Sequence, residues 1–331
     1  MRGMQISTAV DFEKAGRQDG FLRLPHSTDD SAYGFIPIPV TCIRHGEGPT
    51  ILLVAGNHGD EYEGQVALLK LLGSIRTEEV QGRIIVLPAA NLPAAQVGRR
   101  VSPFDEGNLN RCFVERPAVT LTEQIAGFIE HVLMPMSDYA VDLHSGGGSL
   151  RYVPAGVGNI VADDAARNER VKEVLRVFGA PVSFVSDTRL ASRTSFAAAA
   201  IRQKVVAIGT EAGGGASLSV AALGMVETGI QRLLRHLGIL PDRQDEAGTR
   251  LLQVGGPDYF VYAAAAGIFE PYVEPGDEVL PGQPAGAIHF LESPATPPVV
   301  AHFERAGLVL CRRVQGRTKP GDCLFHLGSD G

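Results

Sequence analysis

The stretch that decides the fold reads TILLVA over Thr50–Ala55 and continues as GNHGDEYE over Gly56–Glu63. A short, nearly continuous apolar run is typical of a strand that is buried on both faces, as parallel strands between helices are. The loop that follows turns at Gly56 and Gly59, and a helix is expected over Glu63–Ser74. A buried strand, a glycine-bounded loop and a helix in this order form the repeating unit of an α/β sheet.

The same alternation recurs between residues 46 and 240. Further buried strands are expected at Arg83–Pro88, Tyr139–Leu143 and Lys204–Ile208. We therefore predict an α/β fold in which a mostly parallel sheet is flanked by helices. Apolar residues at helical spacing mark the later helices: Ile125, Phe128, Ile129, Val132 and Leu133 after a capping box at Thr120 and Glu123; Val171, Val174, Leu175 and Phe178; and Ile230, Leu233, Leu234 and Leu237.

Both ends of the chain differ from this middle part. Residues 1–45 are expected to add a β extension, with edge strands over Ile36–Ile43 because prolines interrupt that segment. A polar linker is expected over Asp242–Thr249. From residue 248 to residue 331, glycine and proline recur every few residues and no helical period persists, which predicts a small C-terminal all-β domain.

The composition excludes several classes of function. The 331 residues carry a net charge of −7, so the chain is a poor partner for nucleic acid or anionic lipid. No apolar run approaches the roughly 18 residues that a membrane helix needs, and no secretory signal is visible, so a cytoplasmic protein is expected. The four cysteines are scattered without a CxxC pair, which leaves histidine and carboxylate as ligands for any metal.

Residues that can bind a metal follow two of the expected strands. His58-x-x-Glu61 places an imidazole and a carboxylate where both can reach one cation, and His144 ends the strand at Tyr139–Leu143. Two histidines and one glutamate leave the fourth zinc position open, as catalytic zinc sites do. Asp142 lies two residues before His144 and projects from the same face of the strand, where it can orient an imidazole.

Two further elements complete a hydrolytic set. Glu211 follows the strand at Lys204–Ile208 and precedes a run of glycines. One glutamate can take the proton of an attacking water and then give it to a leaving amine. Residues 99–111 hold three arginines and two asparagines. Because arginine grips carboxylates bidentately, this loop predicts an anionic group on a small substrate.

Each feature also has an ordinary structural interpretation. A lone HxxE, a histidine after a strand or a buried aspartate in a turn is common without a metal, and an arginine-rich loop can be a solvated surface. Cys112 offers a thiol nucleophile, but its neighbours include no evident histidine base. No G-x-S-x-G elbow, phosphate-binding loop or complete dinucleotide-binding motif is present. Three strand ends that each carry one part of the same catalytic set favour a metal hydrolase.

Four motifs in this order resemble the succinylglutamate desuccinylase/aspartoacylase family, which is related to zinc carboxypeptidases. They are GNHGDE at 56–61, RxxPxDxxNLNR at 100–111, DLHSGG at 142–147 and TExGGG at 210–215. The resemblance covers the chain from about residue 35 to residue 330. It implies one zinc ion held by His58, Glu61 and His144. It also implies Glu211 as general base and acid.

The resemblance further implies that Arg100, Asn110 and Arg111 hold the substrate carboxylate and the polarised carbonyl, and that a C-terminal barrel-sandwich-like β-domain covers the mouth of the site. The stretches at 24–31 and 319–323 are most similar to the N-acetyl-diaminobutyrate deacetylase branch. Asp60 stands where many relatives have asparagine. For the tyrosine that relatives contribute from their C-terminal part, the candidates are Tyr259, Tyr262 and Tyr272.

The expected activity is therefore zinc-dependent hydrolysis of the amide bond of a small N-acyl amino acid, with no nucleic acid or membrane partner. A homo-oligomer is left open. Two alternatives also stay open: a metallocarboxypeptidase that cleaves peptides with the same residues, and a zinc-binding sensor of small molecules that has no catalytic role.

Overall fold

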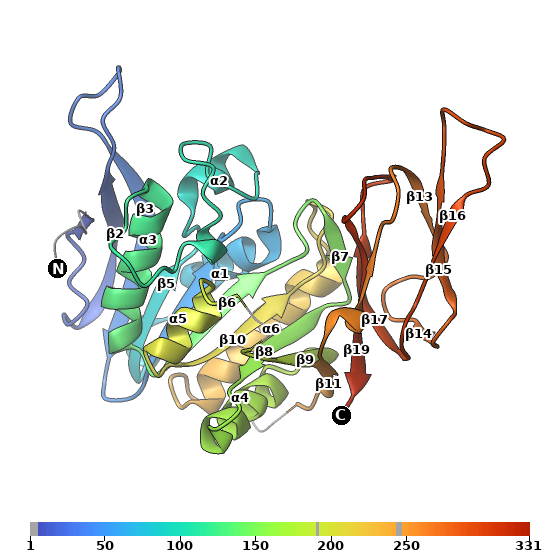
Figure 1. Cartoon of the computed structure of the whole chain (residues 1–331). Coiled ribbons are helices and arrows are strands. Elements are labelled where there is room, and N and C mark those ends of the chain that lie inside the picture. The colour runs from blue at the N-terminus through green and yellow to red at the C-terminus, as the bar shows by residue number, and fades with distance from the viewer. Residues whose placement is uncertain (1–5, 190–191, 243–246) are drawn as a thin grey trace.

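The computed structural model describes residues 6–189, 192–242 and 247–331. A large twisted sheet runs through the whole molecule, with helices on both faces of its middle part and a β-rich C-terminal part at one end (Figure 1). The expected linker at Asp242–Thr249 falls partly on residues 243–246, which lie outside the described residues.

The centre of the sheet is β4 (Thr50–Ala55), which has the bounds expected from its apolar run. It pairs in parallel with β5 (Gly82–Leu87) on one side and with β6 (Tyr139–His144) on the other. Beyond β6, the parallel pairing continues to β10 (Val206–Glu211). Every residue of β4 and β5 is buried, as expected for strands covered on both faces.

The prediction of a mostly parallel sheet is wrong, because the sheet is mixed. β8 (Ala155–Ile160) lies antiparallel to β10, although it is parallel to its other neighbour, β9 (Val182–Asp187). On the opposite flank, β2 (Gly16–Pro25) and β3 (Phe35–His45) form a long antiparallel hairpin, and β3 continues antiparallel to β5. Apolar runs indicate burial but not strand direction, which is why the sequence pattern did not show this.

The segment expected to form edge strands is a single strand, β3, in the interior of the sheet. Its pairing with β2 covers Phe35 to Arg44, whereas its pairing with β5 starts only at Thr41. Pro37 and Pro39 therefore lie where β3 has one neighbour, so their missing N–H groups break no second ladder. β1 (Ser7–Thr8) pairs antiparallel with β2 and forms the edge of the sheet.

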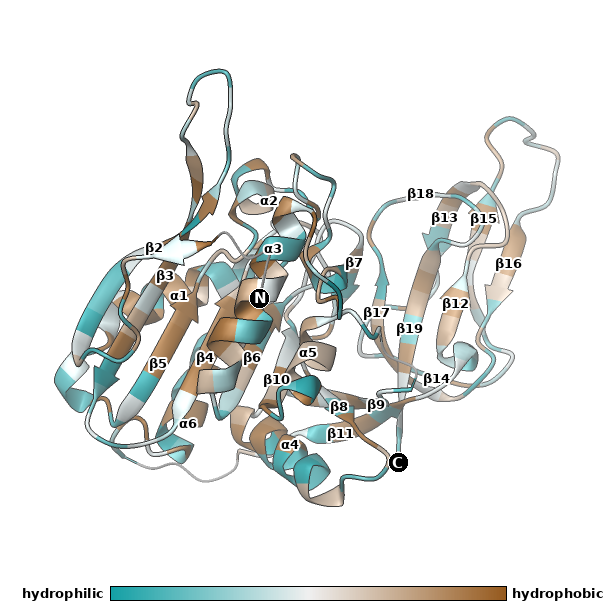
Figure 2. Ribbon diagram, turned by 60° about the vertical axis from the view of Figure 1, so that its left-hand side comes forward, coloured by the Kyte–Doolittle hydropathy of each residue, from teal (hydrophilic) through white to brown (hydrophobic). Residues whose placement is uncertain are grey.

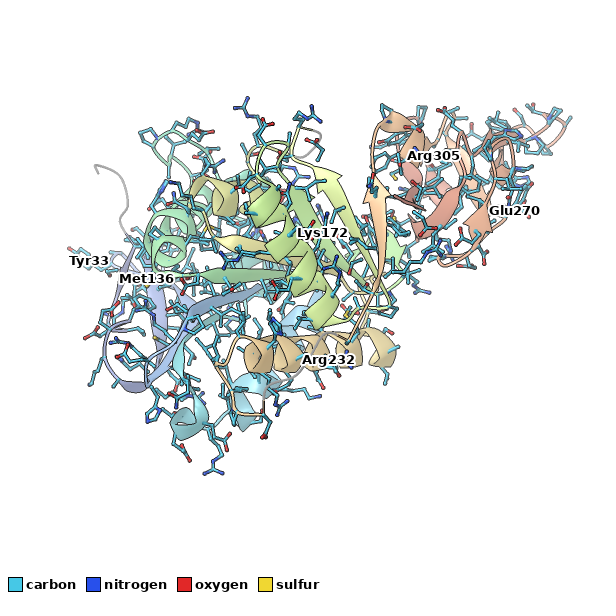
Figure 3. The ribbon with its side chains drawn as sticks, turned by 90° about the horizontal axis from the view of Figure 1, so that it is seen from below. Tyr33, Met136, Lys172, Arg232, Glu270 and Arg305 are labelled. Atoms are coloured by element: carbon cyan, nitrogen blue, oxygen red, sulfur yellow. The ribbon has the colours of Figure 1, made fainter. Side chains whose placement is uncertain are left out.

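Helices cover the two faces of the sheet as two layers. Alternate residues of β4 separate the two cores: Ile51 and Leu53 pack on one face, and Leu52 and Val54 on the other. Seen from below, α4 (which carries Lys172) and α6 (which carries Arg232) lie side by side on one face (Figure 3). The first face carries α1 (Tyr62–Ser74), α4 (Ala165–Phe178) and α6 (Val220–His236); the second carries α3 (Leu121–Phe128) and α5 (Phe196–Arg202).

The capping box is confirmed at the start of α3, where Thr120 and Glu123 bond reciprocally to each other's backbone N–H. The helix predicted to continue through Leu133 changes type: a π turn covers Ile129–Leu133, and a 3₁₀ turn covers Met134–Met136. The remaining short helical elements are α2 (Leu92–Val97) and 3₁₀ turns at Thr77–Glu79, Leu109–Arg111 and Pro257–Tyr259.

The C-terminal part continues the main sheet. β11 (Arg250–Val254) pairs in parallel with β9 and antiparallel with β19 (Cys323–Asp330). β17 (Gly307–Arg313) pairs with β19 and with β7 (Leu150–Tyr152) of the middle part. A second sheet has the order β16-β15-β13-β18. The other C-terminal strands are β12 (Phe260–Tyr262), β13 (Gly267–Pro271), β14 (Glu278–Val279), β15 (Pro284–His289), β16 (Val299–His302) and β18 (Arg317–Thr318).

Apolar residues line the strands of both parts (Figure 2). The third core joins Val182 and Phe184 of β9 to Phe325 and Leu327 of β19. The domain boundaries predicted at residues 46, 240 and 248 stay predictions. Among the described helices, none is long and apolar enough to cross a membrane.

Candidate metal centre

Three predicted ligands converge at the carboxyl ends of β4 and β6. His58 lies in the loop after β4, Glu61 is the N-cap residue of α1, and His144 is the last residue of β6. One donor atom from each lies within 4.8 Å of the other two. The Nδ1 atom of His58 lies 2.8 Å from Glu61 Oε1, and the Nδ1 atom of His144 lies 2.8 Å from Glu61 Oε2.

The far nitrogens of both imidazoles contact acceptor oxygens. His58 Nε2 lies 3.0 Å from Asn108 Oδ1, and His144 Nε2 lies 2.7 Å from Asp142 Oδ2. An acceptor there favours the proton on Nε2, so the lone pair of each Nδ1 points toward Glu61. The three residues therefore fit a divalent metal, and two imidazoles with one carboxylate suit a zinc ion that keeps an open position.

The electrostatics of the cluster also favour a cation. Burial alone would raise the pKa of Glu61, but His58 and His144 outweigh it and hold that pKa well below its usual range. Burial opposes a charge on His144, yet Asp142 and Glu61 raise the pKa of His144 well above its usual value. The carboxylates around the imidazoles thus attract positive charge to the point where the donor atoms meet.

Glu211 ends β10 directly beside His144, because the two residues are paired in register. Burial raises the pKa of Glu211 to about 8, and the negative charge of Glu61 adds to this effect. Its Oε2 is buried without a hydrogen-bond partner. A cation on the neighbouring ligands would lower this pKa and leave a base next to the metal position.

The loop at residues 99–111 brings two of its arginines to the site. The Nη1 atom of Arg100 lies 3.3 Å from His58 Nδ1 and 3.4 Å from Glu61 Oε1. Arg111 is largely exposed, yet the protein atoms packed around its guanidinium and the charge of Arg100 lower its pKa. Among the described residues, no carboxylate pairs with Arg111. The third arginine, Arg99, pairs with Glu106 at the surface.

Asn110 is held by a hydrogen bond to the backbone of α5, and its amide nitrogen lies near His144. Its Nδ2 lies 3.2 Å from His144 Nε2, and its Oδ1 accepts a hydrogen bond of 2.9 Å from the backbone N–H of Phe196. Asp105 anchors the same loop to α3, where it accepts bonds from the backbone and the hydroxyl of Thr122 at 2.8 Å and 2.7 Å. The arginines are therefore presented by a loop that is fixed at several points.

The structure adds two residues that the sequence interpretation did not single out. Asn108 contacts His58, and Asn57 donates a hydrogen bond of 3.0 Å to Asp142 Oδ2. Asn108 lies in the NLNR motif, which was a usable signal, whereas nothing in the spacing marked Asn57. Asp60 accepts a hydrogen bond of 2.7 Å from the backbone N–H of Gly148.

The three candidate tyrosines make other contacts. Tyr259 is buried, its hydroxyl lies 2.9 Å from Ser329 Oγ, and the Arg305 guanidinium lies over its ring. Tyr262 and Tyr272 are half exposed. Tyr152 of β7 lies nearer to Glu211, since its backbone N–H donates a hydrogen bond of 2.9 Å to the carbonyl of Gly213. Burial, Cys311 and the charge of Glu211 raise the pKa of its hydroxyl well above the usual value. Burial also raises the pKa of Cys112 to about 11, which disfavours a thiolate nucleophile there.

Comparisons with known proteins identify relatives of this chain. Residues 47–237 match the model of the succinylglutamate desuccinylase/aspartoacylase catalytic domain. An N-alpha-acetyl-L-2,4-diaminobutyric acid deacetylase from Halomonas elongata is 40% identical over 98% of this chain and 94% of its own length.

Two solved structures have a TM-score of 0.93 and cover 99% of both chains. One is a succinylglutamate desuccinylase/aspartoacylase from Rhodobacter sphaeroides, which is 37% identical. The other is the product-bound ectoine utilization protein EutE (DoeB) from Ruegeria pomeroyi, which is 39% identical.

Proposed function

The chain belongs to the succinylglutamate desuccinylase/aspartoacylase family, and from this premise we propose that it is a zinc-dependent deacylase of small N-acyl amino acids. Its proposed substrate is N-acetyl-2,4-diaminobutyrate. The observation that carries this proposal is the His58–Glu61–His144 cluster with Glu211 beside it in register. The name of the Halomonas elongata relative supports the choice of substrate.

His58, Glu61 and His144 would hold the zinc ion through the donor atoms that already converge. Zinc bound there supplies a Lewis acid that activates a water and polarises the substrate carbonyl. Asn108 and Asp142 keep the two imidazoles in the tautomer that leaves Nδ1 free.

Glu211 moves the protons of the reaction. Its unpartnered Oε2 accepts the proton of the attacking water, because burial and nearby negative charge make this carboxylate basic. After the carbonyl carbon has been attacked, the same oxygen gives the proton to the amide nitrogen, and the carbon–nitrogen bond breaks. The products are acetate and a free amino acid, and Glu211 returns to its starting state.

Arg111 and Arg100 orient the substrate. Arg111 lines the cavity beside Glu211 and has no carboxylate partner among the described residues, so it binds the α-carboxylate of an N-acyl amino acid. Arg100 lies next to His58 and Glu61, where its guanidinium stabilises negative charge that develops on the carbonyl oxygen. Asn110 is held to α5 through its Oδ1, and its backbone carbonyl accepts a hydrogen bond from Arg111 Nη1, which helps to position Arg111.

A hydrolysis assay after metal removal tests this proposal. The protein is stripped with a chelator, one portion is reloaded with zinc, and both are given N-acetyl-2,4-diaminobutyrate, other N-acetyl amino acids and a dipeptide. We expect zinc to restore hydrolysis of the N-acetyl amino acids and not of the dipeptide. Preferred cleavage of the dipeptide would indicate a carboxypeptidase, and bound zinc without turnover of any substrate would indicate a sensor.

A further inference from the structure

Glu63 is a fully buried carboxylate that has no part in the proposed proton transfer. It lies in the first turn of α1, two residues after the ligand Glu61, and is 0% exposed. Its Oε1 accepts a hydrogen bond of 3.3 Å from the backbone N–H of Ser219, and its Oε2 is buried without a partner. Because burying a carboxylate is costly, the segments that Glu63 contacts need to be identified.

The first of these segments is the start of α6. Ser219 is the N-cap residue of this helix, and its hydroxyl accepts a hydrogen bond from the backbone N–H of Ala222. The partial positive charge at a helix N-terminus favours a nearby carboxylate. α1 and α6 pack against each other on one face of the sheet. Glu63 therefore joins the start of α1 to the start of α6.

The second segment is the glycine run that connects Glu211 to α6. Gly213, Gly214 and Gly215 all have positive φ, at 77°, 127° and 78°. A Cβ at position 213 would stand 3.2 Å from Glu63 Oε1, so the backbone two residues after Glu211 packs directly against this carboxylate. Only glycine adopts such a run of conformations at low cost, which lets the chain approach so closely.

The third segment follows the ligand His144. The side chain of Ser145 reaches the Glu63 carboxyl, and the backbone N–H of Ser145 lies 3.2 Å from Glu61 Oε2. The carboxylate of Glu63 thus lies where the segments that carry Glu61, His144 and Glu211 meet. A change at Glu63 can therefore reach the site without touching a substrate.

We propose that Glu63 is a positioning residue, whose carboxylate fixes the glycine run after Glu211 against the start of α1 and so holds Glu211 in place beside the metal ligands. The inference rests on the proposed function, because it takes Glu211 to be the general base. Proton transfer depends on the distance and direction of the base, and a displacement of about 1 Å can lower turnover by about 100-fold. The expected signature is a loss of kcat with KM and bound metal preserved.

Two variants of similar volume isolate the hydrogen bond from the packing. Glu63→Gln keeps an oxygen that accepts from Ser219, whereas Glu63→Met fills the same space without an acceptor. For the zinc-loaded proteins with N-acetyl-2,4-diaminobutyrate, we expect kcat of Glu63→Met to fall by roughly 10–100-fold, with KM and zinc content near the wild-type values. Glu63→Gln should stay within about 3-fold of the wild-type kcat, because it keeps the acceptor.

The outcomes separate positioning from a merely structural role. An unchanged kcat in Glu63→Met, or an equal fall in both variants, would overturn the inference. Loss of zinc from Glu63→Met would also contradict it, since Glu63 would then support the ligand Glu61 rather than the base. A wild-type protein without turnover would overturn the proposed function and this inference with it. Glu169→Met is the matched control, because Glu169 is exposed and pairs with Lys172.

Gly213→Ala tests the same contact from the other side, should Glu63→Met not fold. The added Cβ would press against Glu63 Oε1, so we expect kcat to fall by roughly 10-fold or more with KM unchanged. Gly238→Ala is the control for backbone strain, since Gly238 has a φ of +71° and its Cβ would meet no described atom within 4 Å. An equal fall in both alanine variants would overturn the inference.

A double variant completes the test where both single variants fold. If Glu63 acts through the glycine run, Glu63→Met combined with Gly213→Ala should lose less kcat than the product of the two single losses. A loss equal to that product would show that the two residues act independently, and it would overturn the inference.

Discussion

The two halves of the site differ in how many of their polar atoms have partners. On the ligand side, each imidazole contacts an oxygen at both nitrogens. On the substrate side, Arg111 has no carboxylate partner among the described residues, and one oxygen each of Glu211 and Asp142 is buried without a partner. The contacts on the ligand side fix the positions of the imidazoles before any substrate binds. The polar atoms without partners on the substrate side are free to bind groups of the substrate.

We therefore expect substitutions on the ligand side to have the largest effect on activity. His144→Ala removes one donor of the cluster, so we expect the protein to lose bound zinc and activity to fall by at least about 10⁴-fold. Metal analysis and a hydrolysis assay measure both. His289→Ala is the control, since His289 is exposed and pairs with Glu270. Full zinc content in His144→Ala would remove His144 from the ligand set.

Glu211→Gln distinguishes metal binding from proton transfer. The amide keeps the shape of the side chain but cannot accept a proton, so we expect zinc to stay bound while kcat falls by roughly 10²–10⁴-fold. Glu270→Gln, at an exposed ion pair, is the matched control. Near wild-type turnover by Glu211→Gln would place the general base elsewhere.

Arg111→Ala tests whether the guanidinium group of Arg111 binds the substrate carboxylate. Because its expected partner is the substrate carboxylate, we expect KM to rise by roughly 10–100-fold with a smaller change in kcat and unchanged zinc content. Arg99→Ala removes a surface arginine of the same loop that pairs with Glu106, and it should leave KM near the wild-type value. A fall in kcat alone would mean that Arg111 contacts the reacting carbonyl.

Asn108→Ala probes the support of a ligand rather than the ligand. His58 loses the acceptor that fixes its tautomer, so we expect zinc affinity or activity to fall by about 10–100-fold. A competition assay with a coloured chelator measures the affinity. An unchanged affinity together with unchanged activity would show that the contact with Asn108 does not orient His58.

The smallest effect is expected at Asp105, which anchors the arginine loop. Burial opposes its charge, but the bonds from Thr122 and Gly107 outweigh burial and lower the pKa of Asp105. A lowered pKa in the folded state adds stability above the unfolded pKa of about 3.9, and this stability is lost as pH falls through the folded value. Asp105→Asn should therefore cost about 1 kcal/mol at pH 7 and less near pH 3, as thermal unfolding measures. An equal cost at both values would exclude a role for the charge.

The sequence allowed the ligand half to be predicted and left the substrate half incomplete, for a physical reason. Ligands that end buried strands meet at one edge of the sheet, so His58, Glu61, His144 and Glu211 were recognisable from their positions in the chain. The contacts of Asn57 and the free oxygen of Asp142 depend on how distant loops pack, and no local pattern encodes that.

The sequence pattern also did not predict the directions of the strands. β4 was found at the predicted bounds because its residues are apolar throughout. β8 carries glycines at positions 156 and 158, where Leu175 of α4 packs closely, and so lacks the apolar run that marks a buried strand. β8 lies antiparallel to β10 because the chain first passes through β7. The periodicity of the sequence does not show this path.

A continuous sheet joins β9 of the middle part to β11 and β19 of the C-terminal part. If the chain were cut after the matched residues 47–237, β9 would become an open edge with Val182 and Phe184 stripped of their cover. Such an edge invites pairing with other chains. The C-terminal part therefore covers this edge, and exchanging it between relatives would require the paired strands β9 and β11 to be exchanged together.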